Sequence, residues 1–120
     1  MKKIYSCIML LSIILLSGCG QEHEIKTIVK DFMKDNMTLD DHKVIEWSKV
    51  GDTYFVSDSI IQVMHTHAEQ DKLVKPNTSY MPRTEKLYFI QVKYAVSQDT
   101  IKQTFYLDDQ MSGVVCFKKD

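Results

Sequence analysis

His65 and His67, which are separated by one residue, form the one concentrated pair of metal-ligating side chains in this 120-residue sequence. On a strand such a pair points to one side and can share a metal ion, whereas on a helix the two side chains diverge by about 200°. Zinc usually needs three or four ligands, and further ligands would have to be brought in by folding: His23, His42, Glu69 and Asp71. The sequence therefore favours a solvated histidine pair over a metal site.

Nucleophilic and phosphate chemistry have little support in the residue patterns. No serine lies in a Gly-x-Ser-x-Gly motif, and the sequence contains neither a phosphate-binding glycine loop nor a His-Glu-x-x-His motif. Cys116 lies two residues after Val114 in an apolar stretch with no histidine nearby in sequence. That setting is typical of a small buried side chain rather than a reactive thiol. We therefore expect a non-enzymatic protein without catalytic residues or a cofactor.

The beginning of the chain has the three parts of a secretory signal peptide. Lys2 and Lys3 give a positive start, an uncharged and largely apolar core follows at residues 4–16, and small residues then lead to Cys19. A helix that spans a membrane needs about 20 apolar residues, and this core is shorter. The pattern therefore predicts a cleaved leader over residues 1–18, with an uncleaved signal anchor as the alternative.

The end of this leader, Leu16-Ser17-Gly18-Cys19, resembles the lipobox of bacterial lipoproteins. The resemblance implies that the Cys19 thiol is joined to a diacylglyceryl group, that the peptide is cut between Gly18 and Cys19, and that the new amine is usually acylated. Each buried methylene contributes roughly 0.8 kcal/mol, so two or three acyl chains, such as palmitate, would hold the protein at the membrane almost permanently. The alternative is an ordinary cleaved signal followed by a chance cysteine.

The same resemblance bears on localisation. In the enterobacterial type of sorting, an aspartate after the modified cysteine retains a lipoprotein at the inner membrane, and this chain has Gly20 there. We therefore expect a protein anchored by lipid to the cell membrane, and to the outer membrane in a cell that has one.

Removal of the leader would leave 120 − 18 = 102 residues, which suffice for one domain with a modest core. We expect the lipidated cysteine and a short tether at residues 19–24 and a single domain at 25–120. Without Lys2 and Lys3 the charge is 13 − 16 = −3, with both signs mixed along the chain and no basic stripe for nucleic acid. Cys116 would be the one thiol left besides Cys19, so no intramolecular disulfide is expected.

An amphipathic helix is predicted over residues 22–37, because apolar residues recur there at steps of three and four. They are Ile25, Ile28, Val29, Phe32, Met33 and Met37. The opposite face mixes lysine with aspartate, whereas a helix on a membrane surface usually has a Lys/Arg-rich polar face. The pattern therefore favours packing of this helix on a sheet.

Two strands are predicted next, over residues 43–50 and 53–56, with a tight turn at Gly51 and Asp52 between them. We expect the chain's only tryptophan, Trp47, to lie in or beside the core. Ile45 should share its side of the strand, with Val44 on the other.

The stretch 57–74 is ambiguous between two periodicities. Its apolar residues favour a helix over about 59–71 capped by Ser57 or Ser59, but alternation through Ile61, Val63 and His65 also fits a strand. The stretch 75–84 is rich in proline and other turn-forming residues, so it is predicted to be a loop.

The last third of the chain predicts an antiparallel meander with strands over 87–96, 100–107 and 114–118. Alternation places one set of residues on the same face of the first strand: Tyr88, Ile90, Val92, Tyr94 and Val96. Gly113 is expected to lie in a bulge beside the second turn, at residues 108–111, and the polar residues 118–120 are expected to fray.

These elements together predict an α+β domain in which an N-terminal amphipathic helix packs on a curved antiparallel sheet. The order of elements resembles that of small bacterial lipoproteins with a cystatin-like or NTF2-like fold. The resemblance is carried by Val29-Lys30-Asp31-Phe32, Ile45-Glu46-Trp47-Ser48-Lys49 and Phe105-Tyr106-Leu107-Asp108-Asp109. It implies no shared catalytic residues.

The sequence therefore favours a membrane-anchored envelope lipoprotein that binds an unknown partner without enzymatic chemistry. The partner would contact the exposed sheet face, an edge strand or the loop at 75–84. The basic residues around that loop could face an acidic partner or anionic lipid: Lys72, Lys75, Arg83 and Lys86. Because NTF2-like sheets can curl around a pocket, the alternative is a small-ligand carrier with an aromatic lining of Trp47, Tyr88, Phe89, Tyr94, Phe105 and Tyr106.

Overall fold

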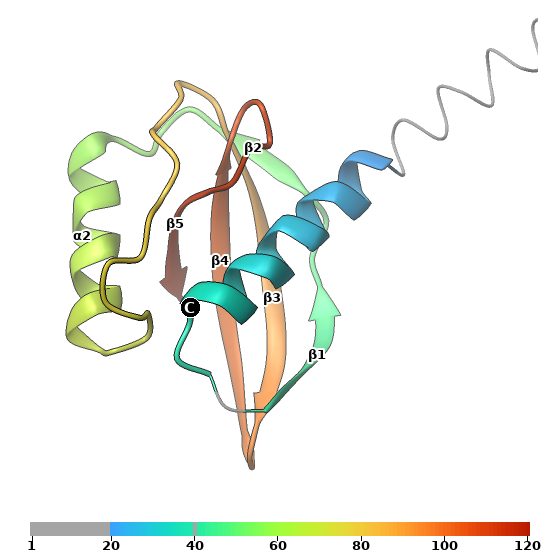
Figure 1. The fold of residues 1–120 in the computed structure, drawn as a ribbon. Coiled ribbons are helices and arrows are strands. Elements are labelled where there is room, and N and C mark those ends of the chain that lie inside the picture. The colour runs from blue at the N-terminus through green and yellow to red at the C-terminus, as the bar shows by residue number, and fades with distance from the viewer. Residues whose placement is uncertain (1–19, 40) are drawn as a thin grey trace, which may run out of the picture.

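The computed structural model describes residues 20–39 and 41–120. The predicted leader at 1–18, its cleavage after Gly18 and the lipidation of Cys19 lie outside these residues. Among the described residues, no helix combines the length and the apolar character needed to cross a bilayer. They form an α+β fold with an N-terminal helix at 20–36, an antiparallel five-stranded sheet and a second helix, α2 (Asp58–Gln70) (Figure 1). The predicted fold class is confirmed.

The sheet has the order β1-β3-β4-β5, and β2 also pairs with β3. Its strands are β1 (His42–Trp47), β2 (Gly51–Thr53), β3 (Leu87–Val96), β4 (Asp99–Asp108) and β5 (Val114–Lys119). The predicted meander of β3, β4 and β5 is confirmed, with strand ends that differ by at most one residue. A two-residue turn at Ser97 and Gln98 joins β3 to β4, and Ser97 has a φ of 55°.

The predicted hairpin between the first two strands is wrong. β1 and β2 do not pair with each other, because both run antiparallel to β3, β1 along Val92–Val96 and β2 along Leu87–Phe89. Gly51 lies inside β2 rather than in a turn, and the Phe89 ring rests directly on it. A Cβ atom at Gly51 would lie 2.4 Å from Cζ of Phe89. The glycine is therefore needed for the close approach of an aromatic ring.

The expected sides of β1 are also wrong. The register of β1 against β3 shifts between Val44 and Glu46, which marks a β-bulge at Ile45. Val44 and Trp47 both pack on the core, whereas Ile45 is 53% exposed. One extra residue reverses the alternation of a strand, so Ile45 does not share the side of Trp47.

The N-terminal helix covers one face of the sheet, as predicted. Its buried side chains pack on those of β3, β4 and β5 in a single cluster, which includes Ile25, Val29, Phe32, Met33, Met37, Ile90, Val92, Tyr94, Phe105, Leu107 and Phe117. Phe32 lies with its ring centroid 6.1 Å from that of Phe105 and 5.8 Å from that of Phe117, in edge-on contacts. Residues 20–24, which were expected to belong to the tether, are part of this helix.

The ambiguous stretch folds as a helix. Ser57 caps α2, and its Oγ accepts a hydrogen bond from the N–H of Ile60 at 3.3 Å. α2 packs beside β5, at the edge of the sheet (Figure 1). Ile61 and Ala68 are its buried residues, and Ile61 joins a second, smaller apolar cluster on the sheet face opposite the N-terminal helix.

The turn between β4 and β5 is tied by the buried Asp108. Its carboxylate accepts hydrogen bonds from the N–H groups of Ser112 and Gly113 at 2.8 and 3.0 Å. The bulge expected at Gly113 is instead at Val115, because Cys116 and Val114 pair with consecutive residues of β4. Gly113 instead faces a methionine side chain, since a Cβ there would lie 2.6 Å from Cγ of Met81.

Candidate functional site

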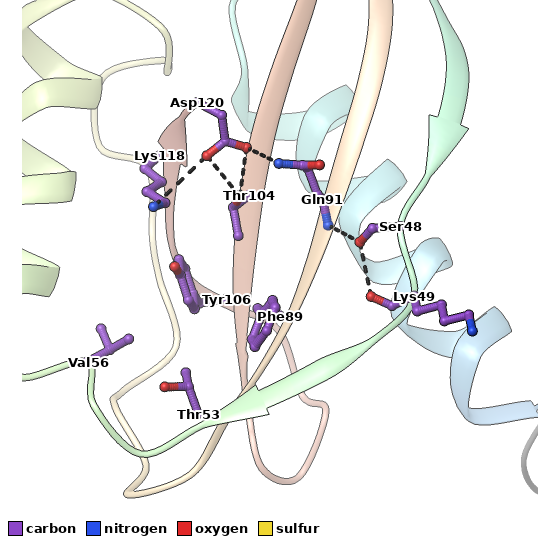
Figure 2. Close-up of a pocket in the computed structure, with 10 residues that line it drawn as sticks. All are labelled: Ser48, Lys49, Thr53, Val56, Phe89, Gln91, Thr104, Tyr106, Lys118 and Asp120. Carbon is purple, nitrogen blue, oxygen red and sulfur yellow. Dashed lines mark hydrogen bonds and ion pairs between the residues drawn. The ribbon is translucent and has the colours of Figure 1, made fainter.

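The sheet face opposite the N-terminal helix carries an open groove. Its cavity of about 630 Å³ has a floor from β3, β4 and β5 and sides from the segments around β2 (Figure 2). We call this cavity the groove, and it is lined by Ser48, Lys49, Thr53, Val56, Phe89, Gln91, Thr104, Tyr106, Lys118 and Asp120. Side chains alternate along a strand, so the floor residues are those that point away from the N-terminal helix.

One end of the groove is polar and centred on Asp120 (Figure 2). Both carboxylate oxygens of Asp120 lie within 3.0 Å of Thr104 Oγ1, and one accepts a hydrogen bond from Gln91 Nε2 at 2.8 Å. The Nζ atom of Lys118 lies 4.0 Å away. On the other side, Ser48 Oγ accepts a bond from the backbone N–H of Gln91 at 2.8 Å. These contacts hold an oriented carboxylate and an amine beside each other at the surface.

The other end of the groove is aromatic. The Phe89 and Tyr106 rings lie 6.1 Å apart at 46°, and the buried Val56 closes this end. Burial raises the pKa of Tyr106, with smaller contributions from Cys116 and Asp120. The phenol is therefore a neutral hydrogen-bond donor at neutral pH, set beside an apolar ring. The groove thus offers apolar and polar contacts at opposite ends.

The six aromatic residues predicted to line one pocket are divided between the two faces of the sheet. Tyr94 and Phe105 are fully buried under the N-terminal helix, and Trp47 and Tyr88 pack against the same core. The other two, Phe89 and Tyr106, line the groove. The single six-residue lining is therefore wrong, because it joins residues from opposite sides of the pleat.

The two histidines of the chelating pair lie on α2 and have different surroundings. His65 stacks on Tyr80, with ring centroids 3.8 Å apart, and its Nε2 lies 2.7 Å from the carbonyl oxygen of Val115, to which the N–H donates. His67 is exposed. Within residues 20–39 and 41–120, no three His, Cys, Asp or Glu side chains are placed to hold a metal ion.

Cys116 is fully buried in β5, as the sequence predicted. Burial raises the pKa of its thiol to about 12. The thiol is therefore protonated at neutral pH, and the thiolate that a nucleophile requires is not formed there.

Both edges of the sheet are modified in ways that hinder strand addition. At β5, the carbonyl oxygens of Val115 and Val114 accept hydrogen bonds from His65 and from the backbone N–H of Met81, the latter at 2.9 Å. At the other edge, β1 has six residues and the bulge at Ile45. Bulges and covering elements are common means of protecting an edge strand. The open face is thus better suited to contact than either edge.

The loop at 75–84 is anchored at its centre by Tyr80 and Met81. Tyr80 packs between His65 and Phe32, and Met81 bonds to β5. The four basic residues of this region lie at the two ends of a segment that runs from the end of α2 to the start of β3 (Figure 1). Lys72 and Lys75 lie after α2, and Arg83 and Lys86 precede β3.

Comparisons with known protein families, with curated proteins and with solved structures found no match for this chain.

The polar residues of the groove were largely missed from the sequence. Alternation along β3 correctly placed Phe89 and Gln91 on the face opposite Tyr94. However, Asp120 was expected to fray, whereas Thr104 and Gln91 hold it in place. No local pattern signals this contact, because it depends on the register of β5 against β4.

Proposed function

We propose that this protein is a lipid-anchored lipoprotein of the bacterial cell envelope, and that it binds a partner protein in the groove without enzymatic chemistry. The supporting observation is the contrast between the two faces of the sheet, since the N-terminal helix fills one face and the other remains an open groove of about 630 Å³. The protected edges favour the face over strand addition. We also propose that the protein is similar to small bacterial lipoproteins with a cystatin-like or NTF2-like fold.

The anchor half of the proposal rests on the leader and the Leu16-Ser17-Gly18-Cys19 sequence. Its test is the intact mass and membrane partitioning of the native protein beside Cys19→Ala. The expected wild-type mass is that of residues 19–120 plus acyl chains, recovered with membranes, while the variant is neither acylated nor retained. A wild-type protein that partitions as a soluble chain would refute the anchor.

The binding half is tested by cross-linking in intact cells. A photoreactive residue replaces Lys49, which lines the groove, or Lys43, which is exposed on β1. We expect one discrete protein adduct from position 49, lost on Tyr106→Arg, and no such adduct from position 43. Circular dichroism checks that Tyr106→Arg keeps the fold. Adducts that form equally from both positions would contradict binding in the groove.

A small-ligand carrier is the second candidate, and the groove's size and lining favour it. Ligand sites commonly have volumes of about 300–1,000 Å³ and combine apolar walls with a few polar groups. Native mass spectrometry of gently extracted protein would then show a bound small molecule, and Tyr106→Ala would lose it. A protein adduct at position 49 with no such bound mass would exclude the carrier in favour of the partner protein.

A further inference from the structure

Four exposed apolar side chains follow one another in the sequence between the end of β2 and the first half of α2. Tyr54 is 57% exposed and Phe55 89%, and Ile60 and Val63 follow on α2 at 43% and 53%. Among the described residues, the other large apolar side chain of this kind is Ile45 on β1. We call Tyr54 and Phe55 the aromatic tip. Two adjacent aromatic residues with this exposure are candidates for contact with another apolar surface.

The aromatic tip is held on both sides by bonded neighbours. Thr53 Oγ1 accepts a hydrogen bond from the N–H of Phe55 at 3.2 Å. The next residue, Val56, is buried, and its carbonyl oxygen accepts a bond from Arg83 Nε at 2.8 Å. Ser57 then caps α2. The backbone around the tip is therefore fixed, and the exposure of Phe55 is a property of the folded surface.

The aromatic tip lies at the end of the sheet where the N-terminal helix begins. Figures 1 and 2 both show the segment joining β2 to α2 and the first turn of that helix at the same end. Residue 20, the first residue that the structure describes, is already helical, and Cys19 is its neighbour in the sequence. Consecutive Cα atoms are about 3.8 Å apart, so acyl chains on Cys19 would be joined next to residue 20 and would hold this end of the domain near the bilayer.

We infer that the aromatic tip enters the interfacial layer of the membrane that holds the Cys19 anchor and so fixes the orientation of the domain. This inference rests on the proposed lipidation. A phenylalanine supplies apolar surface, and a tyrosine suits the boundary between acyl chains and head groups. The charged residues around the tip have both signs: Asp52, Asp58, Arg83, Glu85 and Lys86. The contact is therefore expected in neutral as well as anionic lipid.

This orientation would set the direction in which the groove opens. β3 runs away from the tip, with Leu87 paired to Thr53 at one end and the Ser97–Gln98 turn at the other. A ten-residue strand spans about 33 Å, so that turn would point away from the bilayer. The groove lies on the face of the sheet and would open sideways, toward neighbouring envelope proteins.

The test uses the full-length lipidated protein in phosphatidylcholine vesicles whose acyl chains are brominated and quench tryptophan. In a Trp47→Phe background, Phe55→Trp reports on the tip and Gln98→Trp on the far end of the sheet. We expect the emission at position 55 to fall by about half and shift to the blue, since interfacial residues lie roughly 5–10 Å into the boundary layer. Emission at position 98 should not change.

The outcomes separate this inference from the anchor itself. A protein without acyl mass on Cys19 that does not float with the vesicles overturns both. An acylated, vesicle-bound protein with an unquenched tryptophan at position 55 overturns the tip contact alone. Shielding of position 55 that occurs only in native envelopes, and not in lipid vesicles, would assign the tip to a protein partner and also overturn the membrane contact.

A charge substitution gives a second measurement. Phe55→Asp should increase labelling of the neighbouring Lys86 by an amine-reactive reagent on vesicles, because the tip no longer enters the interface. Ile45→Asp is the matched control, since it changes an exposed apolar residue on β1 and should leave that labelling unchanged. The exposure of both residues predicts that both variants fold. Equal labelling of Lys86 in the two variants would contradict the inference.

Discussion

The two faces of one sheet use the same kinds of residue for different purposes. Under the N-terminal helix, Phe105 and Phe117 stack with ring centroids 5.1 Å apart and are almost completely buried. On the opposite face, Phe89 of β3 and Tyr106 of β4 line an open groove. The side of the pleat, and not the residue type, decides whether an aromatic ring supports the fold or is available for binding.

The faces also differ in how their polar groups are satisfied. On the covered face, the buried Tyr94 hydroxyl donates to Gln103 Oε1 at 2.9 Å, and neither group contacts solvent to any extent. In the groove, Asp120, Thr104 and Gln91 satisfy one another at the surface. Substitutions in the groove should therefore affect binding more than stability, and substitutions on the covered face should do the reverse.

The largest difference between the two faces should appear when one aromatic ring is removed from each. Phe105→Ala should lower the free energy of unfolding by about 3–5 kcal/mol, because it leaves a cavity in a packed core. Phe89→Ala should lower it by less than half as much, since its ring is partly exposed. Urea denaturation followed by circular dichroism measures both. Equal losses would show that the groove face is also part of the core.

The free energy of unfolding should fall at alkaline pH, because the protein buries two phenols and a thiol. Burial raises the pKa of Tyr94, Tyr80 and Cys116 to about 12, from 10.0 for the tyrosines and 9.0 for the cysteine. The unfolded chain therefore loses these protons first, so their stabilising contribution is complete below pH 9 and is lost as the pH rises toward 12. Each group adds a slope of up to about 1.4 kcal/mol per pH unit in its window.

The readout for this prediction is the free energy of unfolding between pH 7 and pH 11. Tyr94→Phe should flatten the decline above pH 10 even though it lowers stability at neutral pH by leaving Gln103 unpaired. A decline of the same steepness in wild type and variant would contradict a raised pKa for Tyr94.

Gly51 tests the contact that replaces the expected turn. Gly51→Ala should lower the free energy of unfolding by about 1–3 kcal/mol, because the new Cβ collides with the Phe89 ring. In a Phe89→Ala background the same substitution should have a much smaller effect. A double-mutant cycle in urea measures this coupling, and additive effects would mean that Gly51 acts through its backbone conformation.

The two histidines of α2 provide a matched pair. His65→Ala should lower stability by about 1–3 kcal/mol, because it leaves the Val115 carbonyl without its donor and removes the ring stacked on Tyr80. His67→Ala should change it little, since that side chain is exposed on the same helix. Thermal unfolding at pH 7 compares them, and similar shifts in Tm would refute the proposed role of His65.

The smallest expected effect is at the turn between β3 and β4. Ser97 has a φ of 55°, a conformation that glycine adopts freely and that L-residues adopt with strain. Ser97→Gly should therefore raise the free energy of unfolding by up to about 1 kcal/mol. The greater flexibility of glycine in the unfolded chain opposes this gain and reduces it. Urea denaturation provides the measurement, and a loss of stability would mean that the Ser97 side chain has a contact that offsets the strain.

The parts of the fold that could be predicted are those with long, regular periodicity. The N-terminal helix, β3 and β4 each repeat one pattern over ten or more residues. The shorter β5 could be predicted because its short connection to β4 makes it the neighbour of that strand. The strand predicted over 43–50 is found as β1, but the bounds of β2, the pairing of both strands with β3 and the sides of β1 could not be predicted. The bulge at Ile45 and the ring packed on Gly51 are tertiary contacts that leave no local periodicity.

The candidate site was predictable to a smaller extent. Alternation along β3 places Phe89 and Gln91 on the face away from the N-terminal helix, which identifies the part of the groove floor that β3 contributes. The polar centre could not be foreseen, since Asp120 meets Thr104 and Gln91 only after three strands have paired in register. Likewise, the local periodicity of residues 57–74 fits both a helix and a strand, and it is tertiary packing of Ile61 and Ala68 that favours the helix.

The central claim is that the open face of the sheet is the binding surface, and lysine labelling in intact cell envelopes tests it most directly. Lys49 and Lys118 line the groove, whereas Lys43 and Lys72 are exposed elsewhere. Compared with purified full-length protein, the envelope-bound protein should show much lower labelling of Lys49 and Lys118 and unchanged labelling of the other two. Equal labelling of all four lysines in both settings would contradict the claim.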